Sequence, residues 1–166
     1  MDLLIRPVRL SDAEAIARIL NTIIAAGCYT VLEGPLTAEA ERDFIARFPP
    51  RGVFLVAERR PDGAIVGLQD VEPFAPYSHA FDHVGTMGTF VDLACRRQGI
   101  GARLTGETLA VARRQGFEKI LTCVRADNPG GLAFYRQIGF RVVGTAERQA
   151  LLGGQYIDEI LIEKLL

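Results

Sequence analysis

The segment Arg96-Arg97-Gln98-Gly99-Ile100-Gly101-Ala102 joins a predicted strand, Val84 to Val91, to a predicted helix that runs from about Gly99 to Gln115. The first backbone N–H groups of a helix have no partners within the helix. Together with the positive end of the helix dipole, they form a site for phosphate oxygens. Gly99 and Gly101 lack Cβ atoms, which lets an anion approach the main chain closely. The segment therefore predicts a phosphate-binding loop.

Two common phosphate-binding motifs do not fit this segment. A Walker A loop ends in Gly-Lys-Ser/Thr, whereas Ala102 and Arg103 follow Gly101. A dinucleotide fingerprint needs a third glycine at position 104, which holds Leu104. Taken alone, the two glycines are also consistent with a tight turn that binds nothing.

The distribution of charge favours a small anionic ligand. From Asp92 to Arg125, seven basic residues stand against three acidic ones, so this segment carries +4 and the rest of the chain −5. The net charge of the whole chain is −1, which predicts neither nucleic acid nor a membrane surface as a partner. For Arg113 and Arg114 we prefer a solvated helix face.

The composition is that of a globular protein. The chain has 166 residues, of which 49% are hydrophobic and 23% charged, and its length predicts a single domain over residues 1–166. Cys28, Cys95 and Cys123 have neither zinc spacing nor the pattern of a disulfide framework. Asp2 and Arg6 break any signal-peptide pattern, and no run reaches the roughly 20 apolar residues of a membrane span. We therefore expect a reduced, cytoplasmic protein.

Hydrophobic periodicity and turn residues predict an α+β fold around one sheet. The predicted strands are Leu3–Val8, Val53–Glu58, Ala64–Val71, Val84–Val91, Ile120–Val124, Arg141–Thr145 and Tyr156–Ile162. The predicted helices run from a capping box at Ser11 and Glu14 to about Gly27, from Thr37 to before Pro49, from Gly99 to Gln115, and from Asn128 to Gly139.

A second motif follows the phosphate loop. It reads Asn128-Pro129-Gly130-Gly131-Leu132-Ala133-Phe134-Tyr135-Arg136-Gln137-Ile138-Gly139-Phe140, so that an Asn opens a helix and a Tyr follows seven residues later. With the Arg-x-x-Gly-x-Gly loop before it, this segment resembles the GCN5-related N-acetyltransferase (GNAT) family. Glu33-Gly34-Pro35-Leu36-Thr37 and Gly154-Gln155-Tyr156-Ile157-Asp158 are similar to phosphinothricin and amino-acid acetyltransferase-like members. The resemblance implies a mixed, mostly antiparallel seven-stranded sheet flanked by about four helices.

The resemblance also implies acetyl-CoA as co-substrate. Its diphosphate would be held by the backbone amides of Arg97, Gln98, Gly99, Ile100, Gly101 and Ala102. Phe90 and Val91 would pair through their main chain with the pantetheine arm, which requires the strand to separate from its neighbour there. A simple core strand is the alternative for these two residues. Arg96 or Arg103 would meet a phosphate, with a solvated arginine as the alternative for each.

Tyr135 is the candidate general acid. Attack of an amine on a thioester expels a thiolate, which a nearby phenol can protonate. On a helix that starts at Pro129, Tyr135 shares one side with Leu132 and Ile138, so a core tyrosine is the alternative. Asn128 is assigned to the co-substrate site, although helix capping alone accounts for it.

The amine must lose a proton, and the sequence leaves the acceptor of this proton open. If the amine has a pKa of about 9–10, deprotonation at pH 7 costs roughly 3–4 kcal/mol. Many members of the family carry a Glu ten residues before the phosphate motif, where this chain has Thr86, which cannot ionise. We expect a water held by Thr86, with Glu72, His83 or Glu33 as the final proton acceptor.

These features predict transfer of an acetyl group to the primary amine of a small molecule, such as an amino acid or its analogue, by direct attack in a ternary complex. Tyr29, Glu33, Glu72 and His83 are the candidates for acceptor binding. We expect no metal at His79 and His83 and no cysteine at the reacting face. The resemblance also implies a homodimer through the C-terminal strands. The alternatives are a non-catalytic acyl-CoA-binding module and an enzyme that acetylates a protein amine.

Overall fold

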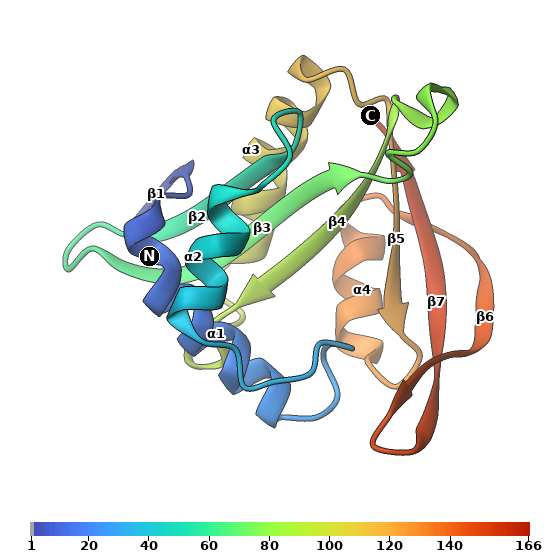
Figure 1. Cartoon of the computed structure of the whole chain (residues 1–166), viewed down its shortest axis with the longest axis horizontal. Helices are drawn as coiled ribbons and strands as arrows, with labels where there is room; N and C mark the ends of the chain where they lie inside the picture. The colour runs from blue at the N-terminus through green and yellow to red at the C-terminus, as the bar shows by residue number, and fades with distance from the viewer. Residues whose placement is uncertain (1) are drawn as a thin grey trace.

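The computed structural model describes residues 2–166 and has one seven-stranded sheet in the order β1-β2-β3-β4-β5-β7-β6 (Figure 1). All neighbouring strands are antiparallel except β4 and β5, which are parallel. The predicted α+β fold is confirmed. The strands are β1 (Leu3–Pro7), β2 (Val53–Arg59), β3 (Ala64–Pro73), β4 (Val84–Val91), β5 (Lys119–Arg125), β6 (Arg141–Leu152) and β7 (Gln155–Leu165). The helices are α1 (Ala13–Ala25), α2 (Ala38–Ala46), α3 (Ile100–Arg114) and α4 (Pro129–Gln137).

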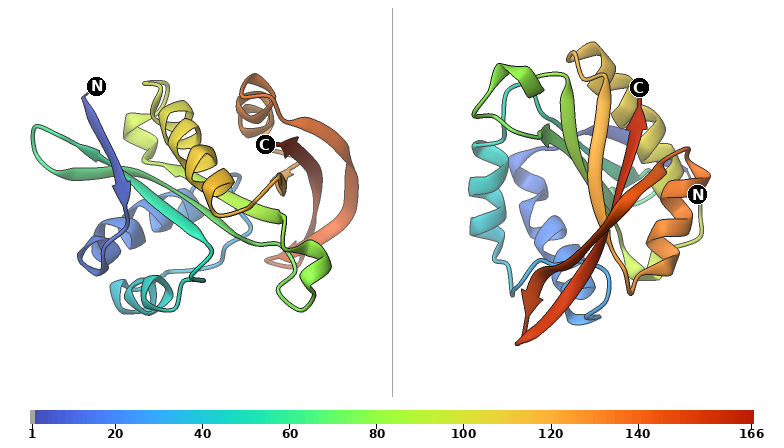
Figure 2. Two further views of the ribbon diagram at one scale, coloured as in Figure 1. Left: turned by 90° about the horizontal axis from the view of Figure 1, so that it is seen from above. Right: turned by 90° about the vertical axis from the view of Figure 1, so that its right-hand side faces the viewer.

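The helices cover the two faces of the sheet in pairs, α1 with α2 and α3 with α4 (Figure 2). Apolar residues at helical spacing bury one side of each helix. On one face, Ile16 and Ile19 of α1 pack in a cluster with Leu68 of β3. On the other, Leu104 of α3 and Tyr135 of α4 belong to a second cluster. Within residues 2–166, no helix combines the length and apolar character needed to cross a bilayer.

Strands β4 and β5 separate soon after they begin. Their pairing is limited to Val84 with Lys119 and Gly85 with Ile120. Beyond this point a side chain bridges the two strands, because the Thr122 hydroxyl of β5 donates a hydrogen bond of 2.8 Å to the Met87 carbonyl of β4. The strands then diverge, as Figure 1 shows, and leave an opening in the middle of the sheet.

The predicted capping box at Ser11 and Glu14 is wrong. A 3-10 turn, Leu10–Asp12, precedes α1, which begins at Ala13. The Asp12 carboxylate accepts a hydrogen bond of 2.7 Å from the Arg9 amide and two of 2.8 Å from the Arg6 guanidinium. Because Arg6 belongs to β1, a contact between strand and helix decides where the first helix starts.

The two C-terminal strands are longer than predicted. β6 bulges twice, between Val142 and Gly144 and between Ala146 and Ala150, and a two-glycine turn at Gly153 and Gly154 joins it to β7. As the edge strand, β6 is held by main-chain hydrogen bonds to β7 and buries few side chains. Its polar middle therefore lacks the apolar alternation that identifies a half-buried strand. Glycines with positive φ are typical of such tight hairpin turns.

Candidate active site

A groove of about 1330 Å³ lies along the opening between β4 and β5. It is lined by the loop after α1, the second half of β4, the loop before α3, and the facing parts of β5 and α4. Eleven residues singled out from the sequence lie on its wall: Tyr29, Phe90, Val91, Arg96, Arg97, Gly99, Ile100, Gly101, Ala102, Asn128 and Tyr135. Gln98 belongs to the same loop and is exposed.

The loop before α3 keeps its main chain accessible. Arg97 and Gly99 have positive φ values of 59° and 77°. A Cβ added at Gly99 would meet nothing within 4 Å, and within residues 2–166 no side chain caps the first turn of α3. The unpaired N–H groups at the start of this helix therefore face open space beside the groove, as an anion site requires.

Gly101 packs closely against α4. A Cβ at this position would lie 3.1 Å from the ring of Phe134 on α4. Gly101 allows α3 and α4 to approach each other closely at the groove wall.

The main chain of β4 offers free hydrogen-bonding groups to the groove. Hydrogen bonds from Phe74 N–H to the Val84 carbonyl and from Asp92 N–H to the Val66 carbonyl fix the register between β3 and β4. Amides of an antiparallel pair alternate in direction, so Thr89 and Val91 direct theirs into the opening. Phe90 directs its amide toward Leu68 of β3 instead. Thr89 is a residue that the sequence analysis missed.

Tyr135 lines the groove and is buried, with 7% of its surface exposed. Its hydroxyl lies 2.8 Å from the Thr89 hydroxyl. Burial raises the pKa of Tyr135 to about 12; the hydrogen bond with Thr89 opposes this shift and the charge of Asp70 adds to it. The phenol is therefore neutral and carries its proton at physiological pH.

Three further side chains near the loop have partners within the protein. The Arg96 guanidinium carbon lies 3.8 Å from the centre of the Tyr29 ring, a cation–π contact. Arg103 donates a hydrogen bond of 3.0 Å to the Leu3 carbonyl. The Asn128 side chain accepts a hydrogen bond of 2.9 Å from the Gly131 amide, so it caps α4 where it lines the groove.

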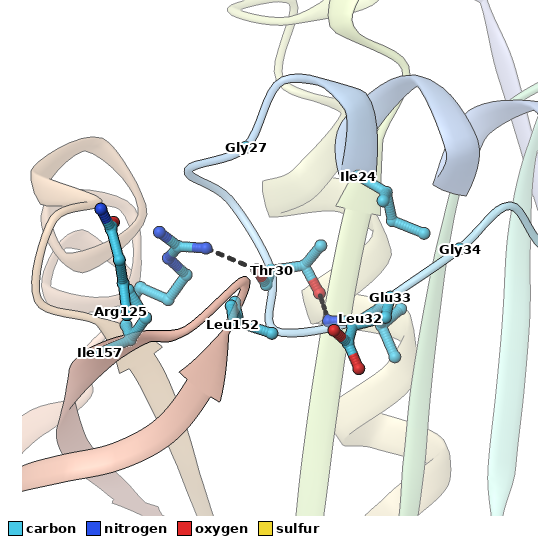
Figure 3. Close-up of a pocket in the computed structure, with 10 residues that line it drawn as sticks. Ile24, Gly27, Thr30, Leu32, Glu33, Gly34, Arg125, Leu152 and Ile157 are labelled. Atoms are coloured by element: carbon cyan, nitrogen blue, oxygen red, sulfur yellow. Dashed lines mark hydrogen bonds between the residues drawn. The ribbon is translucent and has the colours of Figure 1, made fainter.

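The sequence predicts a water held by Thr86 and, besides Tyr29, proton exchange or acceptor binding by Glu33, Glu72 and His83. Within residues 2–166, none of these four residues lines the groove. Thr86 lies opposite Glu72 in the β3–β4 pair. His83 precedes β4, and its carbonyl accepts hydrogen bonds from the Glu118 and Lys119 amides. Glu33 lines a smaller pocket of about 330 Å³ (Figure 3).

Arg125 borders this smaller pocket. It donates a hydrogen bond of 2.9 Å to the Thr30 carbonyl, drawn as a dashed line in Figure 3. Its other nitrogens donate to both carboxylate oxygens of Asp127, at 2.8 and 2.6 Å. Arg125 thus ties the loop after α1 to the end of β5.

The carboxylate of Asp70 on β3 is a second feature that the sequence analysis missed. Its Oδ1 atom accepts a hydrogen bond of 2.9 Å from the Gly88 amide of β4. Burial raises the pKa of Asp70 to about 7, against the lowering effect of this hydrogen bond. No sequence motif marks Asp70, because only the β3–β4 register brings it to the middle of β4.

The cysteines lie closer to the groove than their distance from the two motifs in the sequence indicates. Cys28, Cys95 and Cys123 are free thiols, and all three line the groove. Burial and the neighbouring Glu159 raise the pKa of Cys123 to about 11. A thiol with so high a pKa is a poor nucleophile.

Comparison with known protein families identifies the family of this chain. Residues 5–161 match the model of the acetyltransferase (GNAT) domain. The chain belongs to the GNAT acetyltransferases. Enzymes of this family use acetyl-CoA as co-substrate, and the accessible amides before α3 fit its diphosphate. When bound, acetyl-CoA supplies the activated acetyl group that this acetyltransferase transfers.

Two relatives of this acetyltransferase are named for phosphinothricin and for L-amino acids. The Bacillus subtilis protein YwnH, provisionally named a phosphinothricin acetyltransferase, is 26% identical over 148 residues, or 89% of each chain. The L-amino acid N-acetyltransferase AaaT of Escherichia coli is 29% identical over 98 residues, which are 58% of this chain and 59% of that protein. A Sinorhizobium meliloti phosphinothricin acetyltransferase, solved with acetyl-CoA, superposes with a TM-score of 0.89 over 100% of this chain and 89% of its own. At 20% identity, this last similarity shows the fold alone.

Proposed function

We propose that this acetyltransferase transfers the acetyl group of acetyl-CoA to the primary amine of a small molecule, an amino acid or an amino-acid analogue, by direct attack within a ternary complex. The observation that carries the proposal is the position of Tyr135. Tyr135 lines the groove together with the loop before α3 and the loop after α1, and its neutral hydroxyl contacts the hydroxyl of Thr89. The names of YwnH and AaaT support the acceptor class.

The groove residues divide the binding of the donor between them. The diphosphate is bound by main-chain N–H groups of Arg97, Gln98, Gly99, Ile100, Gly101 and Ala102. Thr89 and Val91 pair their main-chain groups with the amides of the pantetheine arm, as an added strand pairs with a sheet edge. This arrangement directs the thioester toward Tyr135, and Phe90 and Asn128 complete the wall.

Tyr135 donates its proton to the departing sulfur. The Gln69 side-chain amide donates a hydrogen bond of 2.7 Å to the Thr89 hydroxyl oxygen. Thr89 is then able to direct its own proton to the Tyr135 oxygen, which leaves the Tyr135 proton free for the groove. Burial disfavours a thiolate as it disfavours the phenolate, so the pKa values of both groups rise, and the raised pKa of Tyr135 does not by itself oppose the proton transfer.

The loop after α1 and the smaller pocket provide the acceptor side. Tyr29 lies in the groove, and Glu33 lies in the smaller pocket beside Arg125. Glu72 and Thr86 face each other across β3 and β4 on the α1–α2 face of the sheet, and His83 lies just before β4. Of these residues, Tyr29 and Glu33 line the groove and the smaller pocket, which supports a role for them in binding the incoming ammonium group.

The test is release of the CoA thiol across a panel of amino acids, sulfoximine analogues and peptides with free amino termini, together with the affinity for acetyl-CoA from calorimetry. Turnover with free amino acids or sulfoximines is the expected result. Acetyl-CoA binding with turnover of peptides alone contradicts the acceptor class in favour of a protein amine. Binding without any turnover contradicts the proposed transfer.

A homodimer and a cytoplasmic location are further parts of the proposal. The edge strand β6 presents the exposed apolar side chains Val143 and Leu151, and the exposed Tyr156 of β7 lies opposite Leu151. Apolar side chains on an edge strand are suited to pairing with a second copy of the chain. Sedimentation analysis of the wild-type protein measures this directly, and a monomer at micromolar concentration contradicts it.

A further inference from the structure

We propose that Asp70 is the general base of the reaction: its carboxylate accepts a proton from the ammonium group of the acceptor, directly or through one water molecule. This inference rests on the acetyl transfer proposed above. The carboxylate of the base then lies on β3, the strand beside β4, because position 86 of β4 holds a threonine.

The β3–β4 register places Asp70 beside the middle of the groove. Asp70 lies directly opposite Gly88, which lines the groove next to Thr89. A Cβ added at Gly88 would lie 2.9 Å from Oδ1 of Asp70, so the carboxylate fills the space that a side chain at position 88 would take. The hydrogen bond from the Gly88 amide holds the carboxylate in this position.

Asp70 and Tyr135 flank β4 from opposite faces of the sheet. Side chains alternate between faces along a strand. Leu68 and Phe90 belong to the cluster on the α1 side, so Asp70 and Gly88, two residues from each, face the same side. Tyr135 contacts Thr89 on the α3–α4 side. An amine that approaches from the α1 side therefore meets Asp70, and the sulfur departs on the side of Tyr135.

The surroundings of Asp70 allow it to exchange a proton at neutral pH. Burial raises the pKa of Asp70 to about 7, the Gly88 amide lowers it, and the negative charges of Glu72 on β3 and Glu41 on α2 raise it further. Tyr135 on α4 is the titratable group that faces Asp70 from the other side. A base whose pKa lies near the working pH is efficient, because it is ionised before the reaction and still takes up a proton.

The proton balance of the transfer is complete with these two residues. Asp70 accepts the first proton, and the resulting neutral amine forms the C–N bond as the C–S bond breaks. Tyr135 gives its proton to sulfur and regains one from the nitrogen, whose second proton is lost as the amide forms. Asp70 then releases its proton to solvent, which is the one proton that the net reaction liberates.

The experiment compares Asp70→Asn with the wild-type protein and with Asp43→Asn, which neutralises an exposed carboxylate on α2 that pairs with Arg47. The expected result for Asp70→Asn is a fall in kcat of about 100-fold or more, as for loss of a general base, with an unchanged Kd for acetyl-CoA. The wild-type kcat/KM is expected to rise with pH through about 7 and to lose this dependence in the variant. Asp43→Asn is expected to match the wild type.

A measurement without turnover accompanies the kinetics. In protein labelled with ¹³C at the aspartate carboxyl carbons, one signal is expected to titrate near pH 7 and to be missing from Asp70→Asn. If Asp70→Asn does not fold, Asp70→Glu replaces it, with a reduced kcat and a shifted midpoint of the pH dependence as the expected result.

Three outcomes overturn the role of Asp70. If Asp70→Asn keeps the wild-type kcat and pH dependence, the role of Asp70 is overturned while acetyl transfer stands. An unchanged midpoint of the pH dependence in Asp70→Glu also overturns this role. The absence of an aspartate carboxyl signal that titrates between about pH 6 and 8 also overturns it. A wild-type protein without turnover overturns the proposed function, and the role of Asp70 with it.

Discussion

The hydroxyl of Tyr135 on α4 lies 2.8 Å from the hydroxyl of Thr89 on β4, at the opening where β4 and β5 diverge. Thr89 in turn accepts a hydrogen bond from Gln69, which is fully buried, and the same Gln69 nitrogen donates to Thr105 of α3 at 3.0 Å. This chain of hydrogen bonds connects α3, β3, β4 and α4, and it holds the tyrosine hydroxyl in one position.

Tyr135→Phe is therefore expected to lower kcat about 100-fold, since it removes the proposed proton donor. The Thr89 hydroxyl keeps its bond from Gln69, so the unfolding free energy should fall by only about 1 kcal/mol. Steady-state kinetics and thermal unfolding measure both effects. Tyr156→Phe, at an exposed tyrosine outside the groove, is the matched control and should leave kcat unchanged; equal kcat values in the two variants would contradict the role of Tyr135.

Gly99→Ala tests the loop before α3. Gly99 has φ of 77°, a conformation that costs an alanine about 1 kcal/mol or more. We expect reduced stability and an acetyl-CoA Kd that rises several-fold, because the loop amides shift. Gly106→Ala is the control, since Gly106 lies within α3 with open space around its Cα and should gain up to about 1 kcal/mol from better helix propensity. Calorimetric titration with acetyl-CoA separates the two, and equal Kd values would contradict a role for the loop.

Gly101→Ala tests the contact between α3 and α4. The new Cβ would lie 3.1 Å from the Phe134 ring, so that ring must shift by a few tenths of an ångström. Overpacking of this kind costs roughly 1–3 kcal/mol. Because Phe134 lines the groove and contacts the Tyr135 ring at 5.2 Å between centroids, kcat should fall as well. Denaturant unfolding and kinetics check the prediction, which fails if both match the wild type.

The buried ion pair between Arg6 and Asp12 predicts a pH-dependent stability. Burial alone would raise the pKa of Asp12, but hydrogen bonds from Arg6 and the Arg9 amide outweigh it and hold the pKa below its usual value. A carboxyl with a lowered folded-state pKa stabilises the fold above its unfolded pKa of about 3.9 and loses this effect as the pH falls further.

Asp12→Asn should therefore cost about 3 kcal/mol at pH 7, because Arg6 is left buried with Glu58 as its remaining carboxylate partner. The difference from the wild type should narrow below about pH 4, where the wild-type Asp12 also becomes protonated. Urea unfolding at pH 7 and pH 3 measures both values. A difference that is constant between these two pH values would contradict the assignment.

The sequence by itself determined the order of the elements and the two motifs that carry the family resemblance. Apolar residues repeat at helical spacing in α1 and α3, and glycines with positive φ stand at the ends of helices, as at Gly116 and Gly139. These signals are local, because periodicity and left-handed glycines depend on neighbouring residues only. The phosphate loop and Tyr135 are encoded in the same way, since each depends on a few consecutive residues.

Tertiary structure alone decided which side chains meet at the groove. Thr89 and Cys123 line the groove from β4 and β5, and Asp70 of β3 lies opposite Gly88 of the groove wall. The β3–β4 register and the divergence of β5 set these positions. The long edge strand β6 was also beyond local prediction, because main-chain bonds to β7 hold it without an apolar pattern. Pairing between strands depends on residues far apart in the chain, and a shift of one residue would turn Asp70 away from Gly88 to the other face of the sheet.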